Sequence, residues 1–345
     1  MRKVTMQDIA DALNVSRVSV WKVFNDYPGV SEPLRRQIIA KAQEMGYLKL
    51  GQSLMTGEQT ENTESDNQIT ISVVVSRPDS SIFWMNIIHC IAKELTQNNI
   101  NLMYTYLPSK YSSSYTLPSA FTNGTVQGII MLNVYDTTLL QMLNSLRIPK
   151  VFLDIVTSIP EDSLTGDLVL LEGRNSIRKI TNHIIQKGRK NIGFIGATDY
   201  ARTNNDRYEG FKAAMTEHNL PLNPKQCLTG NIGIYTYTEE INQFLSGLDK
   251  MPEAFVCVSD FVANFVIQYL SEHNINVPEE VAISGYDGST EYGDLANYLT
   301  SVQVDTKALG KRLVKQLLYK MNDPDSPNEI IYLSFDIVYG ESTNF

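Results

Sequence analysis

The first fifty residues place apolar side chains three or four positions apart, which is the spacing of amphipathic helices. Thr5 and Asp8 form a capping-box pattern before the first helix, and Ser16 is a capping residue for a second helix over residues 17–24. A third helix is expected between residues 31 and 46, where a glycine would end it. The pattern therefore predicts three short helices around one small shared core.

The predicted second helix has a face that this core leaves uncovered. Val20, Val23 and Phe24 would point into the core, so the side chains on the other side of the helix face outward. The outward side chains are Arg17, Val18, Trp21 and Lys22. A DNA major groove would cover such a face, because Arg and Lys can bond guanine while apolar groups contact thymine methyls. The open alternative is that Trp21 packs against the third helix or a neighbouring domain.

From residue 69 onward, short apolar runs alternate with amphipathic stretches. Continuous apolar strands separated by helices predict parallel sheets that are covered on both faces. Roughly 270 residues exceed the comfortable size of one sheet, so two doubly wound α/β lobes are expected, with a ligand cleft at the carboxyl ends of their strands. The expected strands are residues 71–75, 129–132, 151–153, 192–195, 255–258 and 281–284, and the clearest helices are 84–97 and 205–218.

Composition and charge separate the two ends of the chain. The 345 residues are 43% apolar and carry 29 basic against 38 acidic side chains, a net charge of −9. Residues 1–50 nevertheless hold eight basic and five acidic side chains. A small basic segment on a larger acidic body is expected when only the small segment approaches phosphate.

Several other classes of protein do not fit this sequence. No apolar run approaches the ~20 residues that span a bilayer, and no signal-peptide core follows the N-terminal charges, so we expect a cytoplasmic protein without a membrane partner. The three cysteines are too widely spaced for a disulfide framework or a thiolate metal site. Common hydrolase, nucleotide-binding and zinc-protease motifs are absent. We therefore expect no catalytic residue, no metal and no cofactor.

Three N-terminal motifs resemble the DNA-binding headpiece of the lac repressor (LacI/GalR) family. They are VTMQDIA at residues 4–10, SVWKVFN at residues 19–25 and GY at residues 46–47. The resemblance implies a helix-turn-helix headpiece over residues 1–50, whose second helix enters the major groove. Because the motifs follow one another in the family's order, the resemblance is more specific than a single short signature.

Individual positions take expected roles from this resemblance. Base-reading positions of the family fall on Arg17, Val18 and Lys22, and backbone-contacting positions fall on Thr5, Ser16, Ser19 and Asn25. Trp21 stands on the reading face where the family commonly has a serine, and Lys22 replaces its usual arginine. Because of these two departures, the family's preference for a DNA half-site does not transfer.

Residues 51–68 are expected to form a hinge and an acidic linker. In the family, a hinge helix follows the headpiece and inserts a leucine into the minor groove. Leu54 is the matching residue, but the segment lacks the family's proline and has a glycine and a glutamine where alanine and arginine are usual. These departures leave the hinge helix open. Residues 58–68 contain four acidic and no basic side chains, which predicts a flexible linker.

The remainder of the chain resembles the effector domain of the same family, which is built like the periplasmic sugar-binding proteins. The matching stretches include RKNIGFIG at residues 189–196, RYEGF at 207–211 and VPEEVAISGYD at 277–287. The resemblance implies two lobes with three chain crossings between them. The expected first lobe comprises residues 69–159 and 304–325, and the expected second lobe comprises residues 160–303 and 326–345.

The resemblance also implies effector contacts at the strand ends. The candidates are Ser76, Asp79, Phe83, Asp154, Arg207, Ser259, Asp260 and Asp287, with Trp84 as an alternative aromatic wall. Carboxylates and a guanidinium can hold vicinal hydroxyls, and an aromatic ring can stack on the apolar face of a sugar. Local alternatives stay open: Arg207 could pair with Asp206 or Glu209, and Asp287 could cap a turn before Gly288.

We interpret the chain as a ligand-responsive transcriptional regulator, in the first instance a repressor of a carbohydrate-utilisation operon. It would bind a palindromic double-stranded DNA operator as a homodimer, with tetramer formation as a further option. Its small-molecule effector would be a sugar or sugar derivative. The alternative is a sugar-binding receptor or sensor without operator-specific DNA binding.

Overall fold

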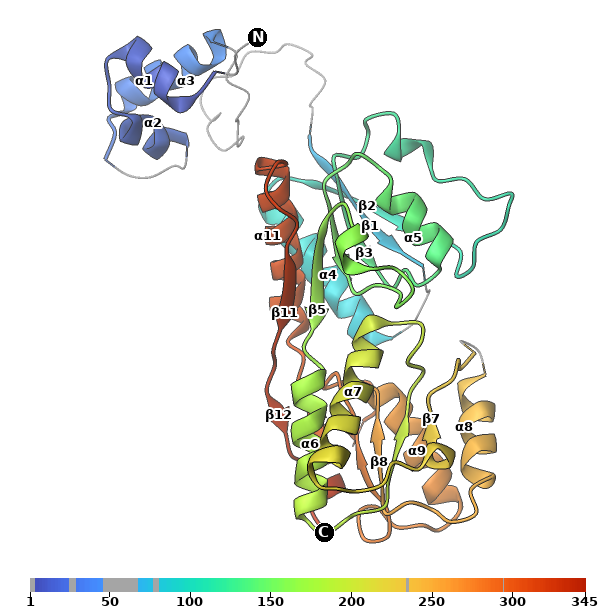
Figure 1. The fold of residues 1–345 in the computed structure, drawn as a ribbon. Coiled ribbons are helices and arrows are strands. Elements are labelled where there is room, and N and C mark those ends of the chain that lie inside the picture. The colour runs from blue at the N-terminus through green and yellow to red at the C-terminus, as the bar shows by residue number, and fades with distance from the viewer. Residues whose placement is uncertain (1–3, 25–28, 46–67, 77–80, 234–235, 294) are drawn as a thin grey trace. The chain divides into compact units, whose positions relative to one another are not determined.

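The chain forms two compact units, Met1–Asp66 and Asn67–Phe345, which are described separately below (Figure 1). The computed structural model describes residues 4–24, 29–45, 68–76, 81–233, 236–293 and 295–345. None of the described helices combines the length and the hydropathy that a bilayer crossing demands.

The N-terminal unit contains three helices, as predicted: α1 (Met6–Leu13), α2 (Arg17–Phe24) and α3 (Glu32–Glu44). The capping box is also confirmed, because the backbone N of Thr5 donates to Asp8 Oδ2 at 2.7 Å and the backbone N of Asp8 donates to Thr5 Oγ1 at 3.3 Å. One small apolar core joins the three helices. Its fully buried members are Ile9, Ala10, Val20, Val23, Ile38 and Ala42.

The first lobe of the C-terminal unit is built on a six-stranded sheet with the order β11-β5-β4-β3-β1-β2, in which all neighbouring strands are parallel. Its strands are β1 (Thr70–Val75), β2 (Asn101–Tyr106), β3 (Gly128–Leu132), β4 (Lys150–Leu153), β5 (Asp167–Leu171) and β11 (Ile330–Leu333). Its helices are α4 (Ile82–Gln97), α5 (Thr137–Asn144) and α11 (Thr306–Asn322).

Helices cover both faces of this sheet, because successive strand residues point to opposite sides. Ile71 and Val73 of β1 join one core cluster with Ile87 of α4 and Leu313 of α11. Val74, one position along from Val73, joins a second cluster with the apolar side chains of α5. The continuous apolar runs of the sequence are thus explained by burial on two sides.

The second lobe has a four-stranded parallel sheet, β7-β6-β8-β9. Phe194 of β6 contacts Phe211 of α7, whereas Phe255 of β8 contacts Phe244 of α8, so the two helices cover opposite faces (Figure 1). The strands are β6 (Ile192–Ile195), β7 (Cys227–Leu228), β8 (Ala254–Cys257) and β9 (Ala282–Ser284). The helices are α6 (Arg174–Gln186), α7 (Arg202–Glu217), α8 (Tyr237–Ser246), α9 (Asp260–Glu272) and α10 (Leu295–Tyr298).

Short elements complete the C-terminal unit. Strands β10 (Ser301–Val302) and β12 (Ile337–Val338) form an antiparallel pair near the passages between the lobes. The 3-10 helices are η1 (Ser119–Phe121), η2 (Glu161–Ser163), η3 (Pro224–Gln226) and η4 (Glu341–Thr343).

The chain passes between the lobes three times, as expected: after β5, before α11 and after β11. The boundaries expected at residues 159/160 and 325/326 are wrong, however, because β5 and β11 pair with each other in the first lobe's sheet. Residues 160–171 and 326–333 therefore belong to the first lobe. The placement of β11 depends on its pairing with a strand about 160 residues earlier in the chain, as in Ile330 with Leu168, which local sequence patterns do not encode.

Candidate functional site

The outward face of α2 follows from its buried side chains. Val20 and Val23 are fully buried in the three-helix core. On the other side of the helix, Val18 and Trp21 expose 60% and 43% of their surfaces. Such apolar exposure beside cations is typical of a surface that a partner covers. The two basic side chains of the helix are Arg17, which is exposed, and Lys22, which is half-buried.

Hydroxyl groups gather at the start of α2. Ser16 Oγ accepts a hydrogen bond from the backbone N of Ser19 at 3.0 Å and lies 2.9 Å from Ser19 Oγ. Thr5, which begins α1, is exposed and donates through its hydroxyl to Asp8 at 2.7 Å. Hydroxyls and first-turn amides at helix N-termini suit phosphate oxygens. The remaining predicted DNA contacts, Asn25 and Leu54, lie outside the described residues.

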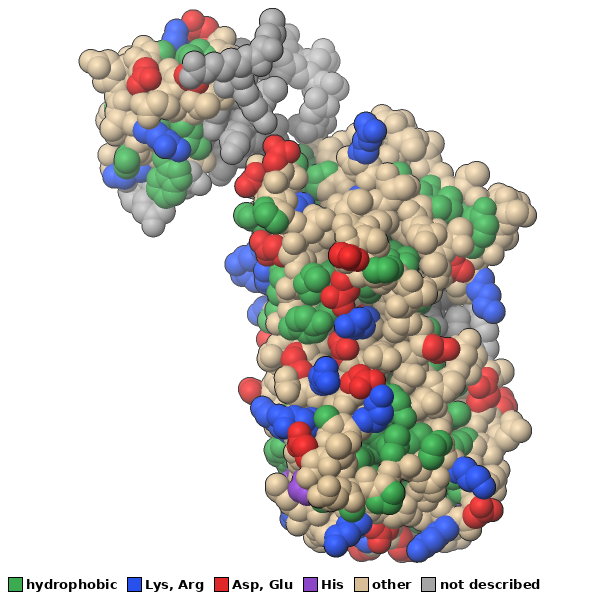
Figure 2. Space-filling model, viewed as in Figure 1, with side chains coloured by type: hydrophobic (Ala, Val, Ile, Leu, Met, Phe, Trp, Pro, Cys, Tyr) green, Lys and Arg blue, Asp and Glu red, His purple; other side chains and the backbone are tan. Residues whose placement is uncertain are grey.

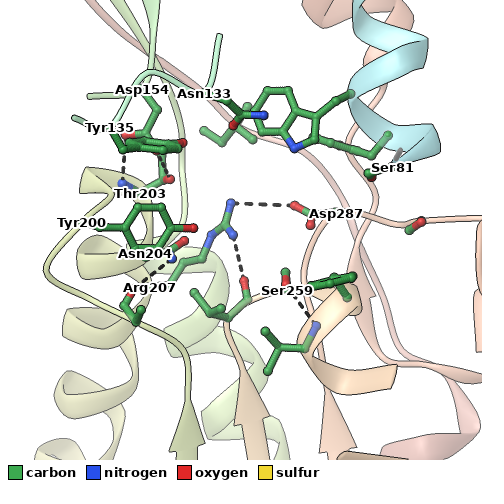
Figure 3. Close-up of a pocket in the computed structure, with 18 of the residues that line it drawn as sticks. Ser81, Asn133, Tyr135, Asp154, Tyr200, Thr203, Asn204, Arg207, Ser259 and Asp287 are labelled. Carbon is green, nitrogen blue, oxygen red and sulfur yellow. Dashed lines mark hydrogen bonds and ion pairs between the residues drawn. The ribbon is translucent and has the colours of Figure 1, made fainter. Parts of the chain in front are cut away.

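A cavity of about 360 Å³ lies between the two lobes of the C-terminal unit (Figure 3). First-lobe side chains reach it from the start of α4 and from the ends of β3, β4 and β5, and second-lobe side chains reach it from α7, α8, α9 and the loop after β9. These strand ends are where α/β sheets hold ligands. The size lies in the ordinary range for small-molecule sites.

Arg207 of α7 projects into the centre of the cavity (Figure 3). Its Nη1 donates to the carbonyl of Val258 at 2.7 Å, its Nη2 lies 3.9 Å from Asp287 Oδ1, and its guanidinium stacks 3.6 Å from the ring centre of Tyr286. The buried Nε has no hydrogen-bond partner in the described structure. The side chain is therefore held in place by Val258 and Tyr286, and Nη2, whose distance to Asp287 is too long for a hydrogen bond, is left to donate to a ligand.

The local alternative for Arg207 is not what the structure shows. Asp206 pairs with Arg202 at 3.2 Å, and Glu209 pairs with Lys212 at 2.6 Å. Both carboxylates are thus occupied by neighbouring cations of the same helix. Arg207 instead points into the cleft.

Asp287 stands on the loop after β9 and faces Arg207 across the cavity (Figure 3). Its φ is 117°, a left-handed conformation, and its backbone is held by hydrogen bonds from its N to Val302 O and from Val304 N to its own carbonyl. Burial raises the pKa of its carboxyl to about 8, even though Arg207 opposes the shift. A strained backbone and a buried acid with a raised pKa are both more frequent at functional sites than elsewhere, which makes Asp287 a candidate for ligand binding.

This carboxyl predicts a pH dependence of stability. The folded protein holds the Asp287 proton at pH values where the unfolded chain has released it, so the free energy of unfolding should fall as pH rises from about 4 to about 8. Asp260, whose pKa burial raises to about 6, contributes in the same direction over the lower part of that range. Asp287→Asn should therefore make the decrease in melting temperature between pH 6 and pH 8 shallower. Equal slopes in the variant and the natural chain would refute this assignment.

Asp154 ties the two lobes together rather than offering a free carboxylate. It stands at the end of β4 with a φ of 65° and accepts hydrogen bonds from the Thr203 hydroxyl at 2.5 Å, from Thr203 N at 3.2 Å and from the Tyr135 hydroxyl at 3.1 Å. Thr203 belongs to α7 of the second lobe, whereas Tyr135 follows β3 of the first (Figure 3). Any opening of the cleft on this side must break the two bonds from Thr203.

The other predicted contacts divide into those that line the cavity and those that do not. Phe83, Trp84 and Ser259 line it, and Ser259 Oγ also caps α9 by accepting from Val262 N at 3.3 Å. Asp260 is buried away from it, bonded to Ser301 Oγ and Ser289 N at 2.7 Å each, and positions the loop after β9. Ser76 donates to Pro108 O at 2.9 Å and is not among the lining residues. Asp79 lies outside the described residues.

Several lining residues were not predicted. Asn133 follows the apolar strand β3 and carries a buried amide N without a hydrogen-bond partner in the described structure, so the strand-end rule could have found it. Glu291 accepts from Ser81 Oγ at 3.2 Å and from Ile82 N at 3.0 Å, which ties the loop after β9 to the start of α4. Contacts of this kind, between residues 209 positions apart, have no local signal. The other unpredicted members include Tyr135, Tyr200, Asn204, Tyr237, Phe261 and Tyr292.

Known proteins match both the second half of the chain and its full length. Residues 181–343 match the periplasmic binding protein-like domain family. The chain is 26% identical to the HTH-type transcriptional regulator RegA of Clostridium saccharobutylicum over 354 residues, covering 98% of this chain and 99% of RegA. It is 25% identical to the HTH-type transcriptional repressor PurR of Actinobacillus pleuropneumoniae over 318 residues, covering 92% of this chain and 91% of PurR.

Solved structures share the fold at lower identity. The complex of the transcriptional regulator CelR with cellobiose superposes with a TM-score of 0.68 at 19% identity, covering 99% of this chain and 100% of CelR. The lac repressor dimer bound to operator and the anti-inducer ONPF gives a TM-score of 0.65 at 19% identity, with 99% of both chains covered. The curated relatives are transcriptional regulators rather than enzymes. Over nearly its whole length the chain is thus similar to curated HTH-type transcriptional regulators, and it shares the fold of the lac repressor and of CelR.

Proposed function

We propose that this protein is a repressor of a carbohydrate-utilisation operon, acting in the cytoplasm, whose affinity for a near-palindromic operator depends on a sugar or sugar derivative. The observation that carries the proposal is the presence, in one chain, of the exposed face of α2 and a polar cleft centred on Arg207 and Asp287. CelR was solved with cellobiose, and a LacI-family regulator from Enterococcus faecium with ribose. Couplings between such sites are typically about 1–3 kcal/mol.

The charge of the cleft favours a neutral ligand over a phosphorylated one. Among the residues that line it, Arg207 is basic, whereas Asp154, Asp287 and Glu291 are acidic. A phosphate would find a single cation beside three acidic side chains. Hydroxyls can instead accept from Nη2 of Arg207 and exchange hydrogen bonds with the carboxyl of Asp287. A polyhydroxylated neutral molecule therefore fits these groups best.

DNA binding is assigned to the N-terminal unit. On the face shown in Figure 2, acidic and basic side chains are interspersed over the C-terminal unit and form no continuous basic surface there. The exposed face of α2 combines Arg17 with the apolar Val18 and Trp21, which matches the mixed donor and methyl pattern of a major groove. An α-helix of this kind reads bases through a few side chains near its N-terminus.

A homodimer is favoured by an apolar surface at one edge of the first lobe. Leu102, Tyr104 and Tyr106 of β2 are in register with Ile71, Val73 and Val75 and so point to the side of the sheet that α4 covers. Tyr104 and Tyr106 are half exposed, as are Ile82 and Met85 on the outer side of α4. We define this dimer surface as Ile82, Met85, Leu102, Tyr104 and Tyr106. A second copy would cover it and present two headpieces to two half-sites.

Met85→Glu should convert the dimer into monomers. Met85 exposes 54% of its surface, the largest exposed fraction among the residues of the dimer surface, and a buried, unpaired carboxylate costs several kcal/mol at an interface. The matched control is Ile330→Glu, which places the same charge on a 47% exposed apolar residue at the opposite edge of the same sheet. Sedimentation equilibrium should show monomers for Met85→Glu and dimers for Ile330→Glu. Dimers in both variants would contradict the assignment of this surface.

Operator selection tests the whole proposal. The full chain is incubated with random duplex DNA, bound sequences are recovered, and the selection is repeated with each member of a sugar panel. We expect an enriched sequence with two inverted half-sites, and a change in its affinity with one class of sugar. Sugar binding without any enriched sequence would instead support the receptor or sensor alternative.

A further inference from the structure

Three aromatic side chains of the second lobe form part of the cleft lining. We define the aromatic shelf as Tyr237, Phe261 and Tyr292, which come from the start of α8, the start of α9 and the loop after β9. All three line the cavity between the lobes. Among the described residues, the guanidinium of Arg207 stacks on Tyr286 and not on a ring of the shelf. The rings of the shelf are therefore left to contact a ligand.

The rings of the shelf are held rigidly by one another. Tyr237 and Phe261 meet edge to face with centroids 5.0 Å apart, and Phe261 and Tyr292 lie 6.5 Å apart. Phe265, which is not a lining residue, braces them from behind, stacked on Tyr237 at 6.2 Å and edge to face with Phe261 at 4.9 Å. Rings fixed in this way lose little conformational freedom when a ligand settles on them.

Phe261 is exposed although it belongs to this packed cluster. Phe261 exposes 38% of its surface, and it is one of the residues that line the cavity. The first lobe contributes Trp84, braced edge to face by Phe83 at 5.3 Å, to the lining of the same cavity. An aromatic wall of this kind gains free energy by covering a flat apolar face.

We propose that the aromatic shelf is a second subsite that binds a second ring of the effector, so that the preferred ligand is a glycoside with two rings rather than a monosaccharide. This inference rests on the proposed function, because it assumes a neutral sugar at Arg207 and Asp287. The first ring makes the polar contacts with Arg207 and Asp287. The second ring, either another pyranose or an aryl aglycone, lays its apolar face on Phe261 and its neighbours.

A matched ligand series tests the shelf on the full-length chain by calorimetry. A panel of common hexoses and pentoses first identifies a monosaccharide that binds. Its methyl glycoside, its disaccharides and its p-nitrophenyl glycoside are then compared. We expect a two-ring member to bind about threefold to tenfold more tightly than the methyl glycoside. Comparing the disaccharides with the p-nitrophenyl glycoside shows whether the second ring is a sugar or an aryl group.

Variants then assign the gain to the shelf. Phe261→Ala should abolish the advantage of the two-ring ligand while leaving the affinity for the methyl glycoside unchanged. Phe244→Leu is the control, since Phe244 contacts Phe255 in the same lobe without lining the cavity, and it should keep the advantage. Equal affinity of the natural chain for one-ring and two-ring ligands would overturn the shelf alone, as would equal losses in both variants. Failure of every sugar to bind would overturn both the shelf and the proposed ligand class.

Discussion

Replacing Arg207 with alanine should abolish the response to the effector and leave operator affinity unchanged. The guanidinium is almost completely buried, is stacked on Tyr286 and is bonded to the Val258 carbonyl, so its position is fixed before a ligand arrives. Truncating a buried charged partner costs about 2–5 kcal/mol, which corresponds to roughly 30-fold to several-thousand-fold weaker ligand binding. The variant also leaves Asp287 without its nearby cation, which raises the pKa of that carboxyl further.

Two variants separate this role from a loss of folding. Arg178→Ala removes a cation from the same lobe that pairs with Glu217 at 2.9 Å on the surface, and this variant should respond to effector normally. Asp287→Asn keeps the size of the side chain opposite Arg207 and should also weaken the response. Operator affinity with and without effector, measured by fluorescence anisotropy, decides the matter. A normal response of Arg207→Ala to the effector would contradict a role for Arg207 in effector binding.

Arg17→Ala should weaken binding to the selected operator by about 1–3 kcal/mol and relax its base preference at one position of each half-site. Arg17 begins α2 and is exposed next to Val18, the most exposed of the large apolar side chains found exposed in the described structure. A bidentate contact from such a side chain to guanine supplies both affinity and base discrimination.

The matched control for Arg17 is Arg36→Ala, which removes the same charge from an exposed position of α3 in the same unit. If Arg17 reads a base, its loss should change the selected sequence, whereas the loss of Arg36 should change only affinity and its salt dependence. Both variants are measured against the operator and against single-base substitutions of it. Identical specificity profiles for the two variants would contradict a base-reading role for Arg17.

The sequence predicted best what depends on near neighbours. Helix α2 has the predicted bounds and α1 begins at its predicted cap, because the caps, Thr5 with Asp8 and Ser16 with Ser19, lie a few residues apart. The six expected strands, which correspond to β1, β3, β4, β6, β8 and β9, were found because their apolar runs are continuous, whereas the equally buried β5 was not expected. Asp287 was proposed through the resemblance to the family, and it lines the cavity after β9.

Local sequence patterns did not indicate the hydrogen-bond partners of residues whose surroundings come from distant parts of the chain. Asp260 follows a strand as Asp287 does, yet it turns to the backbone of Ser289 and the hydroxyl of Ser301 and leaves the cavity. Asp154 was expected to contact the effector, and its oxygens are engaged by donors from both lobes. The sequence marks such carboxylates as strand-end acids but does not indicate which donors will reach them.

By itself, then, the amino-acid sequence determined the three-helix N-terminal unit, the alternation of strands and helices, and the kinds of side chain at the strand ends, because capping, periodicity and burial act over a few residues. The tertiary structure decided the rest. It assigned β5 and β11 to the first lobe, joined Glu291 to the start of α4, and assembled the aromatic shelf from α8, α9 and the loop after β9. These arrangements arise only when segments far apart in the chain pack together, since pairing and packing energies are shared between partners that no local pattern contains.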